Sequence, residues 1–278
     1  MAGQEGPKKA MVIMAHPDDA EFLCAGAVAR WCDEGWEVYY VIATSGDKGS
    51  RDESVSHQEL AARREKEQRD AARVLGVREC IFLGYADGFL EESLELREQL
   101  VRLLRKYQPE VVVTWDGFRR GFNHRDHRIV GRVTYDAIYP AARSLLFYPE
   151  HREEGLGPYR ASELWLAGTE EPDHYVDITP YFDQKMEALR QHASQVGDRP
   201  GREMLKRIRR WYRELGKRAG CKYAEAFRRV QFGRPPEPPR PPPKAARRPP
   251  PDGGPSGPVR AGPPPADARR KTGAAASA

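Results

Sequence analysis

Short apolar runs rich in β-branched residues alternate with longer segments of helical periodicity over the first two-thirds of the chain. The expected strands are 10–15, 37–43, 80–84 and 110–115, and the expected helices are 20–34, 57–75, 93–107 and a segment after His124. This alternation is typical of a parallel sheet covered by helices, because each β-α-β crossover is right-handed. It predicts an α/β fold, a Rossmann-like three-layer α/β/α sandwich with a mostly parallel sheet. The Val-rich run 110–115 is expected to be a buried central strand.

The pattern is weaker beyond Arg143. Residues 163–168 and 175–178 are typical of strands, and residues 202–217 have the pattern of an amphipathic basic helix. Thr179 is expected to be the N-cap of a helix. The order of these elements in the sheet does not follow from the sequence.

The last 46 residues differ in composition from the rest. They contain 15 of the 24 prolines and carry nine Lys and Arg against three Asp and Glu, which leaves 37 basic and 38 acidic residues in 1–232. A segment of this composition buries too little apolar surface to fold. We therefore predict a folded domain over 1–232 and a disordered Pro/Arg/Gly-rich tail over 233–278. Since the basic excess lies in the tail, nucleic acid is an expected partner only through the tail, where arginines suit phosphates.

The cysteines and the N-terminus indicate the compartment. The four cysteines have no CxxC spacing, which indicates neither a disulfide framework nor a thiolate zinc cluster, so we expect reduced thiols. The apolar stretch before Pro17 is too short for a signal peptide or a membrane span. We expect a soluble cytoplasmic protein without a membrane partner.

Polar residues follow nearly every predicted strand of the parallel sheet. These clusters are 16–19, 44–51, 85–88 and 116–127. Ligands of an open parallel sheet bind at the carboxyl ends of its strands, so the clusters are expected to converge on one rim. The rim is the predicted site.

Three side chains of this rim form a predicted zinc site. His16 and Asp19 lie three residues apart where a strand turns into a helix, and His127 reaches the same point from the fourth loop. Two imidazole nitrogens and one carboxylate oxygen suit zinc, and three protein ligands leave one coordination position open, as in catalytic sites. The predicted cofactor is therefore Zn²⁺.

Three further residues have predicted roles around that ion. Asp18, next to a ligand, is placed to accept a proton from water activated by the metal. His124 is placed to donate a hydrogen bond to the oxyanion that forms when water attacks a carbonyl. Asp126 is placed to orient one of the histidines.

Each motif also has a structural interpretation. His-Pro-Asp-Asp is a good helix start, and His-Arg-Asp-His alone is a polar turn. Two such clusters that each follow a strand of one sheet and together supply a ligand set and a base favour the catalytic interpretation. The loop 45–50 has glycines but neither GxGxxG nor a P-loop ending, so we expect a flexible loop beside the substrate and no dinucleotide site.

The sequence resembles a known family. Ala15-His16-Pro17-Asp18-Asp19 and His124-Arg125-Asp126-His127 resemble the two signature motifs of the PIG-L/LmbE-like zinc N-deacetylases, and family-like features span roughly residues 10–232. The variant with Ala20-Glu21-Phe22 is similar to the branch of bacillithiol-type and chitooligosaccharide deacetylases.

The resemblance implies the same roles for the zinc ligands, for Asp18 and for His124. It further implies an N-acetylglucosamine-type substrate, homo-oligomers such as hexamers or trimers, and substrate contacts from Arg64, Asp87 and Ser45. The alternative for Arg64 and Asp87 is an exposed helix charge and a turn residue. His192 resembles a residue that in some relatives approaches the active site, although a lone histidine on a helix is more often structural.

The predicted function is zinc-dependent removal of an N-acetyl group from an N-acetylglucosamine-type sugar or glycoconjugate, which gives acetate and a primary amine. One alternative keeps the metal site but changes the reaction to that of another amidase or a phosphoesterase. A second is a non-catalytic sugar-binding protein whose tail contacts nucleic acid or a partner.

Overall fold

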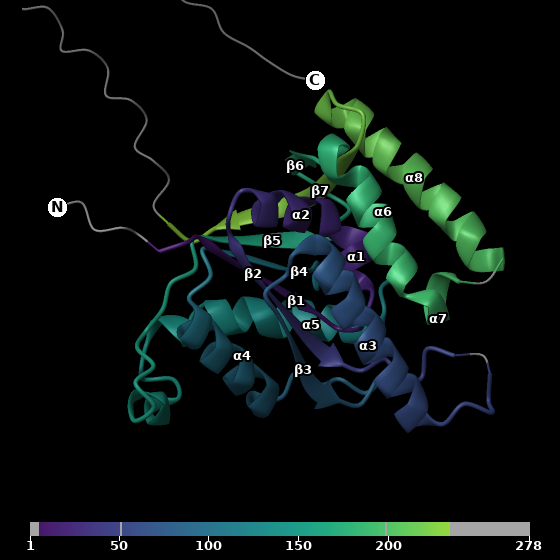
Figure 1. Ribbon diagram of the computed structural model, residues 1–278. Coiled ribbons are helices and arrows are strands. Elements are labelled where there is room, and N and C mark those ends of the chain that lie inside the picture. The colour runs from purple at the N-terminus through teal and green to yellow at the C-terminus, as the bar shows by residue number, and fades with distance from the viewer. Residues whose placement is uncertain (1–5, 51, 198, 234–278) are drawn as a thin grey trace, which may run out of the picture. The chain divides into compact units, whose positions relative to one another are not determined.

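A computed structural model of the chain describes residues 6–50, 52–197 and 199–233 (Figure 1). In these ranges one sheet contains seven strands in the order β3-β2-β1-β4-β5-β7-β6. The strands are β1 (Lys9–Met14), β2 (Glu37–Thr44), β3 (Glu79–Tyr85), β4 (Val111–Trp115), β5 (Glu163–Ala167), β6 (His174–Asp177) and β7 (Ala224–Gln231). β1 to β5 pair in parallel, and β7 is antiparallel to both β5 and β6. The predicted α/β fold with a mostly parallel sheet is confirmed.

Helices cover both faces of the sheet (Figure 1). One face carries α1 (Asp19–Leu23), α2 (Ala25–Asp33), α3 (His57–Leu75), α6 (Phe182–Gln191) and α8 (Arg199–Ala219), with the short α7 (Ala193–Val196) between the last two. The other face carries α4 (Leu94–Tyr107) and α5 (Arg125–Ile138). The predicted three layers are therefore present.

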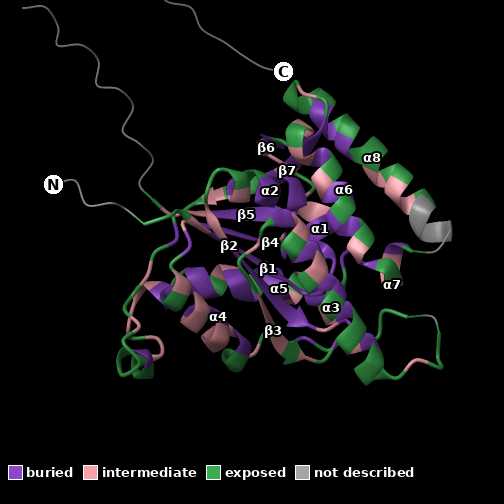
Figure 2. Ribbon diagram, in the orientation of Figure 1, coloured by how far each residue is buried: buried purple, intermediate pink, exposed green. Residues whose placement is uncertain are grey.

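Burial of the sheet on both faces explains the continuous apolar strands. In β1, Val12 packs in the core beneath α2 and α6, whereas Met11 and Ile13 pack in the core beneath α4 and α5, and all three are fully buried. Successive side chains point to opposite faces, so a strand covered on both sides reads as an unbroken apolar run. Figure 2 shows this buried sheet between the helical layers. β4 lies between β1 and β5, which confirms the central strand predicted at 110–115.

The predicted helix 20–34 is interrupted in the structure. Cys24 has φ −140° and ψ 10°, which ends α1 and begins α2. The first N–H groups of α2, from Gly26 and Ala27, donate to the carboxylate of Glu225 at 2.8 Å each. The carboxylate of a residue distant in the sequence therefore accepts the free N–H groups at the N-terminus of α2. No local sequence pattern predicts this contact.

Two predictions for the C-terminal half need correction. Thr179 is not the N-cap of α6, which begins at Phe182 after Tyr181. Instead its hydroxyl accepts the N–H of Tyr223 at 3.1 Å, at the start of a short 3-10 helix (Thr179–Tyr181). β7 was not predicted from the sequence, since Glu225, Arg228 and Arg229 interrupt its apolar pattern, and it is inserted between β5 and β6.

The other predictions beyond Arg143 hold, since β5, β6 and α8 match 163–168, 175–178 and 202–217 within a few residues. Apart from Gly233, the predicted disordered tail of 233–278 lies outside the described residues. In the described part of the chain, every helix is too short or too polar to cross a membrane.

Candidate active site

The loops after β1, β2, β3 and β4 meet at one end of the sheet around a cavity of about 470 Å³. Its walls are His16, Asp18, Asp19, Phe22, Lys48, Gly49, Arg64, Asp87, Gly88, Trp115, His124 and His127. Apart from Trp115, the last residue of β4, these residues belong to the four clusters that follow the predicted strands or to the helices next to them. The rim predicted from the parallel topology is therefore a physical cavity.

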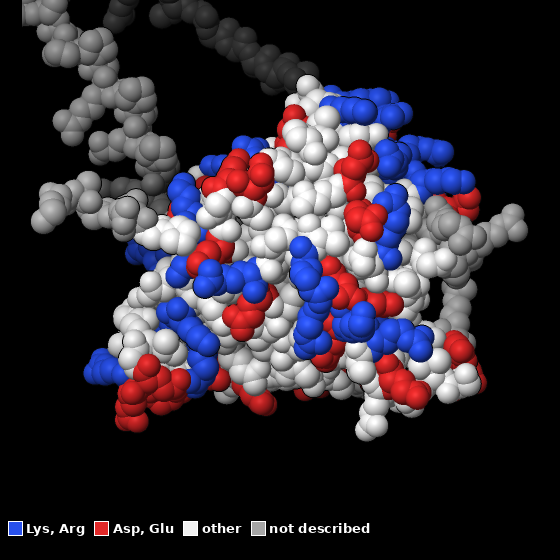
Figure 3. All heavy atoms as spheres, viewed as in Figure 1, with Lys and Arg blue, Asp and Glu red and all other residues white. Residues whose placement is uncertain are grey.

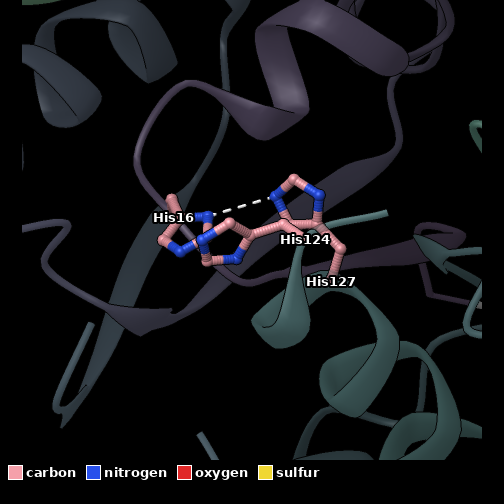
Figure 4. Close-up of side chains that lie close together, drawn as sticks. All are labelled: His16, His124 and His127. Atoms are coloured by element: carbon pink, nitrogen blue, oxygen red, sulfur yellow. Dashed lines mark hydrogen bonds between the residues drawn. The ribbon is translucent and has the colours of Figure 1, made fainter. Parts of the chain in front are cut away.

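Three donor atoms converge in this cavity. Nδ1 of His16 lies 3.1 Å from Nε2 of His127, the contact drawn as a dashed line in Figure 4. The carboxylate of Asp19 lies 3.5 Å from Nδ1 of His16 and 3.2 Å from Nε2 of His127. Ligand atoms at about 2.0–2.2 Å from a tetrahedral zinc ion are separated by roughly 3.3–3.6 Å. The chemistry and spacing of this set therefore fit a zinc ion.

The opposite edge of the His16 ring is held by two carboxylates. Its Nε2 lies 3.2 Å from Asp126 and 3.1 Å from Asp87. Asp126 is fully buried and accepts the N–H groups of Gly88 at 2.7 Å and Leu90 at 3.2 Å. A proton held on Nε2 leaves Nδ1 as a lone-pair donor that points toward the other two ligand atoms. Asp126 thus contacts a histidine, which is His16, and its orienting role stays a prediction.

The electrostatics of the site favour a cation. Burial alone lowers the pKa of His16, but hydrogen bonds to Asp126, Asp19 and Asp87 raise it to about 12. For Asp19 the raising effect of burial is outweighed by His127 and His16, which hold its pKa well below the ordinary value. A site that retains a proton on its own histidine this strongly stabilises positive charge.

Asp18 is held beside these atoms in an uncommon backbone conformation. Its φ of 94° lies in the left-handed region, and its N–H donates to Oε1 of Gln68 at 2.9 Å. Its carboxylate pairs with Arg64 at 3.1 Å. Burial raises the pKa of Asp18 to about 6, against the opposing effect of Arg64. Strained conformations of this kind persist where neighbours hold them, and they cluster at functional sites.

His124 occupies the N-cap of α5. Its Nδ1 accepts the N–H of Asp126 at 3.2 Å, so in the neutral ring the proton lies on Nε2. Burial lowers the pKa of His124, and the neighbouring His16 and His127 lower it further. The His124 and His16 rings meet edge to face with centroids 4.8 Å apart (Figure 4). A neutral His124 therefore carries a hydrogen-bond donor at the cavity.

The three predicted substrate contacts lie in different surroundings. Arg64 lines the cavity but is only 4% exposed, which excludes an exposed helix charge. Asp87 also lines the cavity, where its carboxylate contacts His16 and accepts the N–H of Lys48 at 3.0 Å. Ser45 is not brought to the cavity, since its hydroxyl donates to Glu65 at 2.6 Å. Of the three, Arg64 and Asp87 remain available as predicted contacts.

The loop after β2 is packed against Arg64. The guanidinium donates to the carbonyls of Gly46 at 2.8 Å and Pro17 at 2.7 Å. A Cβ at Gly46 or Gly49 would lie 2.2 or 2.3 Å from this guanidinium, so only glycine permits the approach. We predicted a flexible loop from these glycines. In the structure they allow the loop to pack closely against the guanidinium of Arg64.

His192 is buried behind the site. It is fully buried, does not line the cavity, and its Nε2 lies 3.1 Å from Glu21. Glu21 in turn accepts the side-chain amide of Gln68, which holds the Asp18 N–H. His192 therefore reaches the site through Glu21 and Gln68 and makes no contact of its own with the cavity.

Two residues at or beside the site, Trp115 and Gln68, were not predicted from the sequence. The Trp115 ring stacks on His127 with centroids 3.8 Å apart and an interplanar angle of 11°. Gln68 lies four residues after Arg64 on α3, and this i,i+4 spacing places both side chains on one face of the helix. That spacing was the available signal for Gln68, whereas the stacking of Trp115 depends on tertiary structure.

Comparison with known proteins identifies the family. The family model PIG-L, described as GlcNAc-PI de-N-acetylase, matches residues 11–138, a range that contains both histidine motifs. The diacetylchitobiose deacetylase of Thermococcus kodakarensis is 32% identical over 226 residues, which cover 80% of this chain and 83% of the relative. The chain belongs to the PIG-L family. The resemblance noted from its two motifs is thereby confirmed.

Other PIG-L relatives agree with this assignment. A probable N-acetyl-alpha-D-glucosaminyl L-malate deacetylase 2 of Bacillus anthracis is 27% identical over 197 residues, covering 66% of this chain and 80% of the relative. The solved structure of the N,N'-diacetylchitobiose deacetylase from Pyrococcus horikoshii, complexed with its inhibitor MPG, has a TM-score of 0.78 and 35% identity. It covers 81% of this chain and 85% of that chain.

Proposed function

We propose that this PIG-L chain is a zinc-dependent hydrolase that removes the N-acetyl group from an N-acetylglucosamine-type sugar or glycoconjugate. The observation that carries the proposal is the convergence of His16 Nδ1, His127 Nε2 and the Asp19 carboxylate within 3.1–3.5 Å of one another. Asp18 lines the same cavity with a carboxylate that none of these contacts uses. The site thus combines a ligand set with a base.

Zinc would be held by His16, Asp19 and His127, with Asp126 orienting His16. When bound, zinc supplies a Lewis acid that polarises the acetyl carbonyl and lowers the pKa of water to about 7. Two neutral imidazoles and one carboxylate with an open position are a ligand set of catalytic zinc sites.

The chain's own residues move the protons. Asp18 accepts a proton from the attacking water, and Arg64 at 3.1 Å fixes the position of the carboxylate. His124 donates its Nε2–H to the acetyl oxygen as that oxygen becomes negative. Asp18 then passes its proton to the sugar nitrogen, because an amine leaves only once it is protonated. The C–N bond breaks, and acetate and a primary amine are released.

The substrate class rests on the names of the relatives. Those relatives are named as a diacetylchitobiose deacetylase and a probable N-acetyl-alpha-D-glucosaminyl L-malate deacetylase. Arg64 and Asp87, both in the cavity wall, are the proposed sugar contacts. A cavity of about 470 Å³ is in the size range of small-molecule sites.

The test is release of primary amine and acetate from a panel of N-acetylglucosamine derivatives: the free sugar, diacetylchitobiose, and the inositol and malate conjugates. Chelator-stripped protein should be inactive, and zinc should restore activity where magnesium does not, because magnesium prefers six oxygen ligands. Release that persists after stripping would remove zinc from the proposal.

The same samples separate the alternatives. Phosphate release from sugar phosphates without acetate release would favour a phosphoesterase. Sugar binding without any product would favour a binding protein.

A further inference from the structure

A second cavity adjoins the catalytic one. Its volume is about 630 Å³, and it lies between α8, the end of α1 and the loop that follows β5. Phe22 and Trp115 line both cavities. Since Trp115 also stacks on His127, the second cavity begins beside a proposed metal ligand. We call it the α8 groove.

The wall that α8 contributes to this groove is apolar. Met204, Ile208, Trp211 and Leu215 line it at intervals of four, three and four residues, which is one stripe of a helix. Such a stripe normally packs against a core, yet Trp211 remains 62% exposed. Tyr212 anchors the helix by donating its hydroxyl to the carbonyl of Phe22. The groove is therefore a fixed apolar surface without a covering segment among the described residues.

The charges along the groove limit its occupant. Arg207 and Arg218 line it, and neither pairs with a carboxylate within 6–50, 52–197 and 199–233. α8 carries nine Lys and Arg against two Glu, and Figure 3 shows the basic side chains along it. A second copy packed α8 to α8, or the chain's own tail of nine Lys and Arg against three acidic residues, would bring like charges together. A small uncharged apolar group meets no such repulsion.

We infer that the α8 groove is an aglycone subsite, which takes an alkyl or aryl group attached to the anomeric oxygen of the acetylated sugar. The inference rests on the proposed function, because it needs the sugar ring in the catalytic cavity. It goes beyond that function in naming the chemistry next to the ring. Concave, mostly apolar cavities of roughly 300–1,000 Å³ are typical ligand sites, and the continuity through Phe22 and Trp115 lets one molecule occupy both cavities.

The test compares octyl and methyl 2-acetamido-2-deoxy-β-D-glucopyranoside, both below the micelle concentration of the octyl compound. Binding is measured by calorimetry, and acetate release is measured separately. The octyl glycoside should bind at least about tenfold more tightly, since each buried methylene favours binding. Ile208→Trp fills the groove and should abolish that preference, while binding of the methyl glycoside is kept. Arg210→Trp, on an exposed residue of α8 outside the groove, is the matched control and should keep the preference.

The outcomes separate this inference from the proposed function. Acetate release from the methyl glycoside without tighter binding of the octyl glycoside would contradict the aglycone subsite and would still support the proposed deacetylation. Tighter octyl binding that is lost in Ile208→Trp, with no acetate from either compound, would support the groove and contradict deacetylation. If Ile208→Trp changed the oligomeric state by light scattering and left the octyl preference intact, the groove would be a subunit interface and the inference would be wrong.

Discussion

Two clusters of buried polar side chains meet at α1 and differ in how their charges are completed. The rim cluster, defined as His16, Asp18, Asp19 and His127, brings two imidazole nitrogens and a carboxylate within 3.1–3.5 Å of one another. The interior cluster, defined as Glu21, Gln68, Lys185, His192 and Glu225, is fully buried. In it Lys185 donates to Glu225 at 2.8 Å and to the carbonyl of Glu21 at 2.9 Å.

The difference shows how to tell a functional cluster from a structural one. Glu225 accepts from Lys185 and from two backbone N–H groups, so its charge is satisfied within the protein. The rim cluster instead brings two imidazole nitrogens and one carboxylate within 3.1–3.5 Å of one another, an arrangement that a cation can complete. Burial and charge are common to both clusters. The convergence of donor atoms, which the rim cluster has and the interior cluster lacks, is what indicates chemistry. Variants in the two clusters should accordingly fail in different ways.

His127→Ala should have the largest effect on the rim cluster. It removes one of three donor atoms, so we expect the bound zinc per chain to fall to a small fraction and activity to disappear, while the metal-free protein keeps its melting temperature. Zinc is measured by mass spectrometry after dialysis. His174→Ala, on a partly buried histidine of β6, is the control. Unchanged zinc in His127→Ala would remove this residue from the ligand set.

Asp18→Asn should separate chemistry from metal binding. Without a general base, kcat should fall by about 10³-fold, since such catalysis contributes roughly 10²–10⁴-fold. Zinc content and melting temperature should stay close to those of the unmodified chain. Steady-state kinetics compares it with Asp33→Asn as a control, because Asp33 accepts the hydroxyl of Tyr181 and does not line the cavity. Turnover at the normal rate in Asp18→Asn would show that another group is the base.

Lys185→Met tests the interior cluster. It leaves Glu225 buried without its cation, and breaking a buried pair in this way costs about 3–5 kcal/mol of unfolding free energy. Burial lowers the pKa of Lys185, but Glu225 and Tyr212 together raise it above its ordinary value, so the ammonium form is the one that is lost. Chemical denaturation measures the loss, and zinc per folded chain should not change.

Two controls define that result. Lys206→Met removes the exposed pair with Glu203 and should leave the melting temperature unchanged. The double variant Lys185→Met/Glu225→Gln should recover part of the stability, because it also removes the unpaired charge. If the double variant were no more stable than Lys185→Met, an unpaired Glu225 would not be the cause of the loss.

Gln68→Met tests the link between the two clusters. The side chain of Gln68 bonds the Asp18 N–H at 2.9 Å and the Glu21 carboxylate at 3.0 Å, so its loss should loosen the left-handed conformation of Asp18. We expect kcat to fall about tenfold, with KM and zinc content unchanged, which corresponds to roughly 1.4 kcal/mol. Gln184→Met removes a comparable amide bond to the Val74 carbonyl and serves as control. An equal loss of kcat in both variants would indicate a general structural effect.

Deletion of residues 234–278 should have the smallest effect. Among the described residues, the last one in the sequence that lines the cavity is His127. We expect kcat/KM to change less than twofold in side-by-side assays. A large loss would place part of the tail in the site and would overturn the predicted division at residue 232.

The sequence predicted the rim better than the interior for a physical reason. The proposed ligands lie in the segments that follow β1 and β4, and parallel topology brings strand ends together, so the convergence of His16, Asp19 and His127 was predictable. The interior pairs join residues far apart, such as Glu21 and His192 at a separation of 171 residues. The hydrophobic periodicity of a sequence does not predict a contact between residues so far apart. The same holds for β7 and for the break at Cys24, both of which depend on partners distant in the chain.

The hydrogen bonds from the first turn of α2 to Glu225 span 198 and 199 residues. The ribosome synthesises the loop at residues 16–19 early and Glu225 near the end of the described chain. Within the described residues β6 pairs with β7 alone, so it lacks that neighbour in the sheet until β7 has been synthesised. Synthesis order and assembly order therefore differ, and non-local contacts of this kind form slowly. A nascent chain released before residue 225 would hold the whole ligand set and still lack the strand that secures the helix beside it.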